Sequence, residues 1–129
     1  MKKIMMGLLT FGIFTFNAQA YDQTDRIKDM QSMESAMSQI QKGILYNNKD
    51  MVLQAVVKLK KAASTIEVAP NSELDYSTFF AKRQSSNIKK YADGIKKNME
   101  SGHKHGAASN YTRVLDECIS CHNKIRKWN

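Results

Sequence analysis

The chain has 129 residues, of which 42% are hydrophobic and 25% charged, and its formal net charge is +8 at pH 7. This length fits one domain with a single core that does not depend on several disulfides. The basic residues come in separate pairs without interleaved aromatic residues, which argues against nucleic-acid binding and is typical of a solvated helix surface or of electrostatic steering toward an acidic partner. These pairs are Lys60-Lys61, Lys82-Arg83, Lys89-Lys90 and Lys96-Lys97.

The N-terminus has the pattern of a secretory signal. Lys2 and Lys3 precede an apolar stretch over residues 4–16, and Ala18-Gln19-Ala20 has the small-x-small form of a signal-peptidase site. We therefore expect a signal peptide over residues 1–20, cleaved after Ala20, and a periplasmic domain over residues 21–129 with a charge of +6. The apolar stretch is shorter than the ~20 residues of a stable membrane span, so we expect none, and an uncleaved anchor is the alternative.

The first predicted helix runs over residues 22–46, and the second follows after Lys49-Asp50. Apolar residues recur at steps of three and four in each, which is the period of an amphipathic helix. These residues are Met30, Met33, Met37, Ile40 and Ile44 in the first helix, and Val52, Val56, Leu59, Ala63 and Ile66 in the second. Asn47-Asn48 separates the two helices, and Asp50 is the predicted cap of the second. The short loop predicts antiparallel neighbours.

A connection over residues 67–75, which contains Pro70, precedes two further predicted helices. The third has the stripe Ile88, Tyr91, Ile95 and Met99, with Phe79 and Phe80 upstream. A turn over residues 102–106 follows, and the fourth helix has the stripe Tyr111, Leu115, Cys118, His122 and Ile125. Strand signals are nearly absent. The sequence therefore predicts an all-α, antiparallel four-helix bundle.

The most specific signal in the chain is Cys118-Ile119-Ser120-Cys121-His122. In this C-x-x-C-H pattern two thiols add to the vinyl groups of a haem and the histidine ligates its iron. Positions i, i+3 and i+4 of a helix point the same way, so Cys118, Cys121 and His122 can meet one flat macrocycle. The alternatives are a disulfide, a thioredoxin-like redox pair, and a zinc site that includes His103 or His105. We expect one covalent haem c and its iron.

With these residues the sequence resembles the class II cytochromes c, the cytochrome c′ family, which are four-helix bundles with the haem motif near the end of the last helix. The resemblance covers residues 21–129, and its specific parts are residues 118–126 and 26–30. It implies that Arg126 lies by the proximal face of the haem, that Arg26 approaches a haem propionate, and that Met30 is the distal residue. Without the resemblance, both arginines read as surface charges. Many members of the family dimerise through their first two helices, and the sequence leaves open whether this chain forms such a homodimer.

The second axial ligand of the iron separates the functions that we expect. Met30 is the predicted distal ligand opposite His122, and Met33 is the reserve. His103 and His105 are excluded as ligands because a helix from His105 to Cys118 separates them by roughly 20 Å. The predicted function is single-electron transport, with acidic redox proteins as partners. The alternative is a five-coordinate haem that binds nitric oxide or carbon monoxide, and weak peroxidase activity ranks last.

Overall fold

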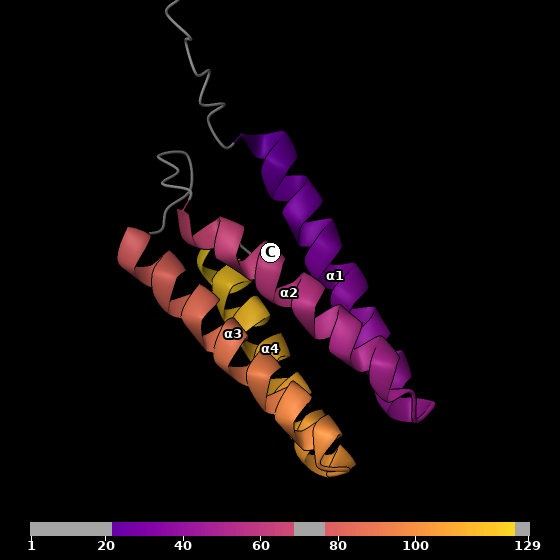
Figure 1. Cartoon of the computed structure of the whole chain (residues 1–129). Helices are drawn as coiled ribbons and strands as arrows, with labels where there is room; N and C mark the ends of the chain where they lie inside the picture. The colour runs from indigo at the N-terminus through magenta and orange to yellow at the C-terminus, as the bar shows by residue number, and fades with distance from the viewer. Residues whose placement is uncertain (1–21, 69–76, 126–129) are drawn as a thin grey trace, which may run out of the picture.

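The computed structural model describes residues 22–68 and 77–125, and within them the chain forms four α-helices in up-and-down order (Figure 1). They are α1 (Gln23–Leu45), α2 (Lys49–Val68), α3 (Thr78–Glu100) and α4 (Lys104–Ile125). Helices that follow each other in the chain pack closely, whereas α1 and α4 make the least contact of the packed pairs. The predicted all-α four-helix bundle is confirmed.

The two ends of the bundle carry different features (Figure 1). One end holds the turn from α1 to α2 and the turn from α3 to α4, and we call it the turn end. The other end holds the start of α1 and the last turns of α4, where residues 118–122 lie, and we call it the motif end. Because the helices alternate in direction, residues far apart in the sequence meet at each end.

Short polar side chains that accept hydrogen bonds from backbone N–H groups set where the helices begin. At the start of α1, Asp25 N donates to Asp22 Oδ1 at 2.9 Å, and Asp22 N donates back to Asp25 Oδ2 at 3.4 Å. Before α2, Asn47 takes the left-handed φ of 57°. The predicted cap Asp50 was wrong, because Asn48 Oδ1 accepts from Met51 N at 3.0 Å and Asp50 lies within the first turn.

The connections differ from the predicted ones. Helix α2 continues through Val68, two residues into the stretch predicted as a loop, and residues 69–76, which include Pro70, lie outside the described residues. Ser77 caps α3 by accepting from Phe80 N at 3.2 Å. The turn predicted over residues 102–106 is shorter, because α4 begins at Lys104. No helix among the described residues has the length and apolar content needed to cross a membrane.

The predicted apolar stripes form one core. Their buried members are Met33, Met37, Ile40, Val52, Val56, Leu59, Ala63, Ile88, Ile95 and Met99. Others pack against this core from its edge, namely Met30, Ile44, Ile66, Tyr91, Tyr111 and Cys118. The stripe predicted for α4 was wrong in one respect, because Val114 and Ala107 are fully buried while Leu115 is 43% exposed. Leu115 follows Val114 directly and lies at the border of this buried face.

Two glycine–asparagine pairs fix how α3 lies against α4. Gly94 and Asn98 are four residues apart on α3, and Gly106 and Asn110 repeat this spacing on α4. The Asn110 side chain lies over Gly94 and the Asn98 side chain over Gly106, so that a Cβ on either glycine would collide. Asn98 Nδ2 donates to Gly94 O at 2.8 Å, and Asn110 Nδ2 donates to Gly106 O at 2.9 Å. These reciprocal contacts fix the register of the α3–α4 pair.

Candidate functional site

The residues of the C-x-x-C-H motif lie in the last two turns of α4. Cys118, Cys121 and His122 occupy positions i, i+3 and i+4 of a continuous helix, so their side chains leave it on the same side. All three are half-buried, Cys118 packs against the core, and both cysteines carry free thiols. The helix thus presents two thiols and one imidazole together at the boundary between core and solvent.

The surroundings of the two thiols are apolar enough to shift their ionisation. Burial raises the pKa of Cys118 from its usual value near 9 to about 11, with a smaller contribution from neighbouring Cys121. Burial also raises the pKa of Cys121. Because an apolar environment disfavours the thiolate, both groups are protonated thiols at neutral pH.

The register of α3 and α4 identifies what lies beside the motif. Asn87 Nδ2 donates to Glu117 Oε1 at 3.1 Å, so these two residues share a layer of the bundle. In an antiparallel pair each step back along α3 matches an equal step forward along α4. The turn of α3 before Asn87 therefore lies beside Ser120 and Cys121. Gln84 is in that turn and is only 4% exposed, so its amide is part of the core next to the motif.

The Gln84 amide is incompletely satisfied. Its Oε1 is buried and has no hydrogen-bond partner in the described part of the chain. Its neighbour Ser85 is also buried, but Ser85 Oγ donates to Ala63 O at 2.7 Å. A buried amide oxygen without a partner costs about 1–3 kcal/mol. The open acceptor marks a place where a water or a bound group would complete this end of the core.

Met30 of α1 lies at the motif end. Lys58 Nζ of α2 donates to Gln39 Oε1 of α1 at 3.4 Å, which fixes the register of these two helices. Counting toward the motif end from that contact places Met30 in the layer of Ile66, within about one helical turn. Both residues are half-buried and pack against the core.

The same counting extends from α2 through α3 to α4. Ser85 of α3 is hydrogen-bonded to Ala63, so the turn beyond Ala63, which is the layer of Met30, meets residues 81–82. By the register of α3 and α4, residues 81–82 lie level with His122. Met30 and His122 therefore share one layer of the bundle, within about a helical turn.

The other residues predicted on α1 lie on either side of Met30. Arg26 is half-buried one turn closer to the motif end, and Met33 is buried one turn deeper in the core. Arg126 and the predicted signal over residues 1–20 lie outside the described residues. His103 and His105 are exposed at the turn end, at the opposite end of α4 from His122.

Apolar side chains remain exposed near the motif. Leu115 is 43% exposed and Ile119 is 45% exposed, and the two lie one turn apart on α4 next to Cys118 and His122 in the sequence. On α1, Ile27 is likewise half-exposed one turn before Met30. The motif end therefore carries exposed apolar side chains on both α1 and α4.

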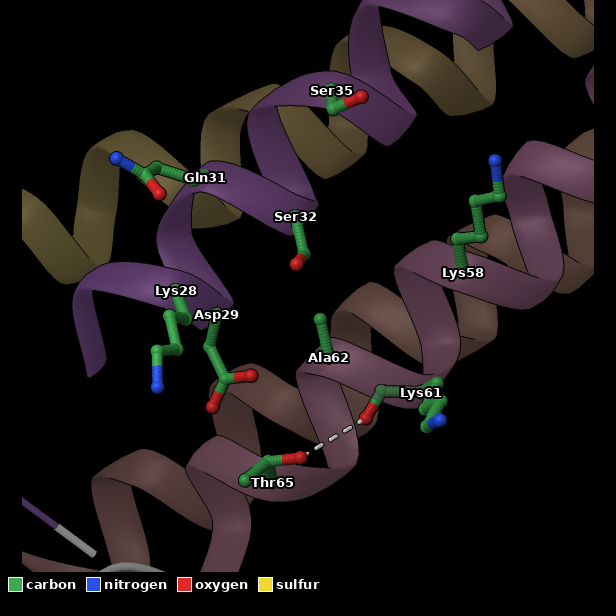
Figure 2. A pocket seen from close by; sticks show the side chains of 9 residues that line it. All are labelled: Lys28, Asp29, Gln31, Ser32, Ser35, Lys58, Lys61, Ala62 and Thr65. Carbon is green, nitrogen blue, oxygen red and sulfur yellow. Dashed lines mark hydrogen bonds between the residues drawn. The ribbon is translucent and has the colours of Figure 1, made fainter. Parts of the chain in front are cut away.

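A groove of about 590 Å³ lies on another side, between α1 and α2 (Figure 2). Eight of its nine lining residues have polar or charged side chains, among them Asp29 and Ser32 from α1 and Thr65 from α2, and Ala62 of α2 points toward Ser32. None of the predicted site residues lines this groove. It is therefore separate from the candidate site.

The residues at the motif end fit a covalently attached haem. The two thiols are one turn apart with an imidazole adjacent to the second, as the two vinyl groups and the iron require. Their apolar surroundings suit a macrocycle. Among residues 22–68 and 77–125 no group of three or more His, Cys, Asp or Glu side chains is arranged to hold a bare metal ion.

Sequence reasoning missed one residue of this site. Gln84 lies four residues before Ile88, so the helical period already placed it on the apolar stripe of α3. The signal was a polar residue at a core position. Its importance was hidden because the sequence does not show which turn of α3 lies beside Cys121.

Comparisons of this chain with models of protein families, with curated proteins and with solved structures find no significant match.

Proposed function

We propose that this protein is a periplasmic c-type cytochrome with one haem that carries single electrons. The observation that carries the proposal is the presentation of Cys118, Cys121 and His122 on one side of α4, half-buried at the motif end. This spacing of two thiols and an imidazole is the pattern of covalent haem attachment. The packing of Cys118 against the apolar core supports it, because an attached macrocycle would be shielded from water there.

We further propose that the chain belongs to the cytochrome c′ family. The support is a four-helix bundle with the motif near the end of the last helix, together with Met30 and Arg26 at the same end on α1. Arg126, the proximal arginine in this proposal, lies outside the described residues.

Each side chain has a distinct role in the proposed site. Cys118 and Cys121 would hold the haem through thioether bonds to its two vinyl groups, with each thiol hydrogen going to the second vinyl carbon. The His122 imidazole and the Met30 thioether would hold the iron. When bound, haem would supply a metal centre that takes up or releases one electron, and a histidine and methionine ligand pair would favour a high reduction potential. The positive charge of Arg26 would neutralise a propionate.

The proposed location follows from the predicted signal over residues 1–20, with the domain over residues 21–129 exported. Edman sequencing or mass spectrometry of the periplasmic fraction tests this, and a mature chain that begins at Tyr21 is the expected result. A chain that retains residues 1–20 in the membrane fraction would instead support the uncleaved anchor.

Visible spectra of the protein expressed with its signal in a host competent for haem attachment test the function. A sharp, split α band after reduction and no change under carbon monoxide are expected for a six-coordinate electron carrier. A broad high-spin spectrum that shifts under carbon monoxide would favour the gas-binding alternative. A chain with no covalent haem would contradict the proposal altogether.

Replacing Met30 by alanine tests the distal ligand. We expect the Met30→Ala variant to have a high-spin reduced spectrum and to bind carbon monoxide, because the sixth position loses its thioether. Met33→Ala is the matched control, since Met33 is buried one turn deeper. An unchanged spectrum in Met30→Ala would rule Met30 out, and an open iron in Met33→Ala would assign the bond to Met33.

The second candidate function is the capture of nitric oxide or carbon monoxide at a five-coordinate iron. It is favoured by the sparse packing between α1 and α4, because α1 packs mainly on α2 and few contacts with α4 would keep Met30 on the iron. Peroxide turnover ranks behind it, since we assign no distal acid or base.

A further inference from the structure

Positive charge is concentrated on one helix of the bundle. Helix α3 carries six basic and two acidic side chains, whereas α1 carries three of each. The six basic residues form what we call the basic stripe, which consists of Lys82, Arg83, Lys89, Lys90, Lys96 and Lys97. The sequence showed these residues as separate pairs, and the structure places all three pairs on a single straight helix (Figure 1).

The spacing of the stripe is regular. The three pairs recur every seven residues, which is close to two helical turns, so successive pairs lie on the same side of α3 about 10 Å apart. All members are exposed except Lys89, which is half-buried. Because the Debye length is about 8 Å at physiological salt, the repulsion between successive pairs is largely screened there and is appreciable only at low ionic strength. A partner of opposite charge would therefore bind the stripe most strongly at low ionic strength.

The two acidic residues of α3 lie close to Lys60 and Lys96. Asp93 contacts Lys60 of α2 at 2.6 Å, so it compensates a lysine outside the stripe. Glu100 is 3.9 Å from Lys96, an exposed pair that contributes little. On the α4 side, Arg113 and Lys90 both lie over the ring of Tyr91, so the positive surface continues onto the neighbouring helix.

The stripe reaches the candidate site. By the register of α3 and α4, Lys82 and Arg83 lie in the layer of Cys121 and His122. A partner that covers the stripe would therefore lie alongside the motif end.

We propose that the basic stripe of α3 is the surface that docks an acidic protein, and, resting on the proposed function, that this protein is the redox partner. A protein surface is favoured over a lipid surface because membrane-bound amphipathic helices insert an apolar face, whereas the apolar face of α3 is buried in the core. Carboxylates spaced along a helix or strand of the partner would match the rows of cations.

The test compares two variants with the same change in charge. The stripe variant is Arg83→Glu, Lys90→Glu and Lys97→Glu. The control variant is Lys28→Glu, Lys49→Glu and Lys104→Glu, all exposed residues on other helices. Circular dichroism first establishes that both variants are folded. The probe is poly-L-glutamate, titrated at low ionic strength into the whole protein, with binding followed by calorimetry and mapped by NMR chemical-shift changes.

We expect shifts confined to α3 and the adjoining face of α4, and an affinity about tenfold lower in the stripe variant but nearly unchanged in the control. Equal losses in both variants, or shifts spread over all four helices, would overturn the proposal, because net charge alone would then explain binding. Stripe-dependent binding to phosphatidylglycerol vesicles that is tighter than binding to poly-L-glutamate would also overturn it, in favour of a membrane.

Voltammetry on a carboxylate-terminated gold electrode tests separately whether docking at the stripe supports electron transfer. We expect an electron-transfer wave that is lost in the stripe variant and kept in the control. Localised poly-L-glutamate binding by a chain without haem would leave the docking surface standing and remove the proposed function. A normal haem spectrum with no binding at α3 would leave the proposed function standing and overturn the docking surface.

Discussion

The turn end and the motif end of the bundle are built from the same four helices but packed differently. At the turn end, Ile40, Val52 and Ile95 are fully buried, and the paired glycines and asparagines let α3 and α4 approach closely. At the motif end, Met30 and Ile66 are only half-buried, and the core contains the amide of Gln84. The turn end holds the fold together, and the motif end carries the residues proposed to bind a group.

This difference shows how a small bundle can be stable and still hold a large cofactor. Close packing at one end supplies contacts that do not depend on any ligand. The other end can then keep half-exposed apolar groups such as Leu115 and Ile119 without loss of the fold.

Two matched isoleucine substitutions test the comparison most strongly. In the haem-free chain, Ile95→Ala at the turn end should lower the free energy of unfolding by about 3 kcal/mol, because Ile95 is fully buried and the substitution leaves a cavity. Ile66→Ala at the motif end should cost about 1 kcal/mol or less, since Ile66 already has contact with solvent. Urea denaturation measures both, and equal losses would show that the two ends are packed alike.

The pH dependence of stability sharpens the description of the motif end. Folding raises the pKa of Cys118 from near 9 to about 11, so the folded state holds this proton more tightly than the unfolded state does. The stabilisation is present below pH 9 and is lost as the pH rises through 11, with a total of about 2 kcal/mol. Thermal melts of the haem-free chain between pH 8 and 11 should show this loss. Cys118→Ala should lack this component, and identical profiles would mean that Cys118 is solvated.

The smallest expected effect is a gain in stability. Gln84→Leu removes an unpartnered amide oxygen from the core and replaces it with a side chain of similar size. In the haem-free chain we expect this to raise the free energy of unfolding by about 1 kcal/mol. Asn87→Leu is the control, because Asn87 donates to Glu117 and its loss should destabilise. A destabilised Gln84→Leu would show that the amide already has a partner.

The fold could be predicted because each helix carries a clear apolar period. The stripes through Met33 and Ile40, and through Ile88 and Ile95, are buried as expected. On α4 the period alone could not separate Leu115 from Val114, because adjacent residues both border the stripe and the choice depends on which neighbouring helix packs closely. The cap of α2 was misplaced by two residues because Asn48 and Asp50 are both good capping residues.

The candidate site, like the fold, could be predicted from the sequence only in part. The positions of Cys118, Cys121 and His122 on one side of a helix follow from their spacing, which is local. The neighbours of the motif are not local, since the proximity of Gln84 depends on the register of α3 against α4. That register is set by Gly94 and Asn110, whose contact no single-helix pattern reveals. The haem, its ligands and the function stay predictions that the spectra will test.

The reciprocal glycine–asparagine contacts fix both the axial position and the rotational orientation of the motif. A helix behaves as a screw, so a slip of α4 by one residue would move the motif about 1.5 Å along the axis and also turn it by about 100°. Such a slip would turn the His122 side chain by the same angle. The contact of Asn110 with Gly94 opposes sliding of α4 along α3, although Asn110 lies about 18 Å along the helix from His122. The direction of a proposed iron ligand thus depends on two amides toward the turn end, those of Asn98 on α3 and Asn110 on α4.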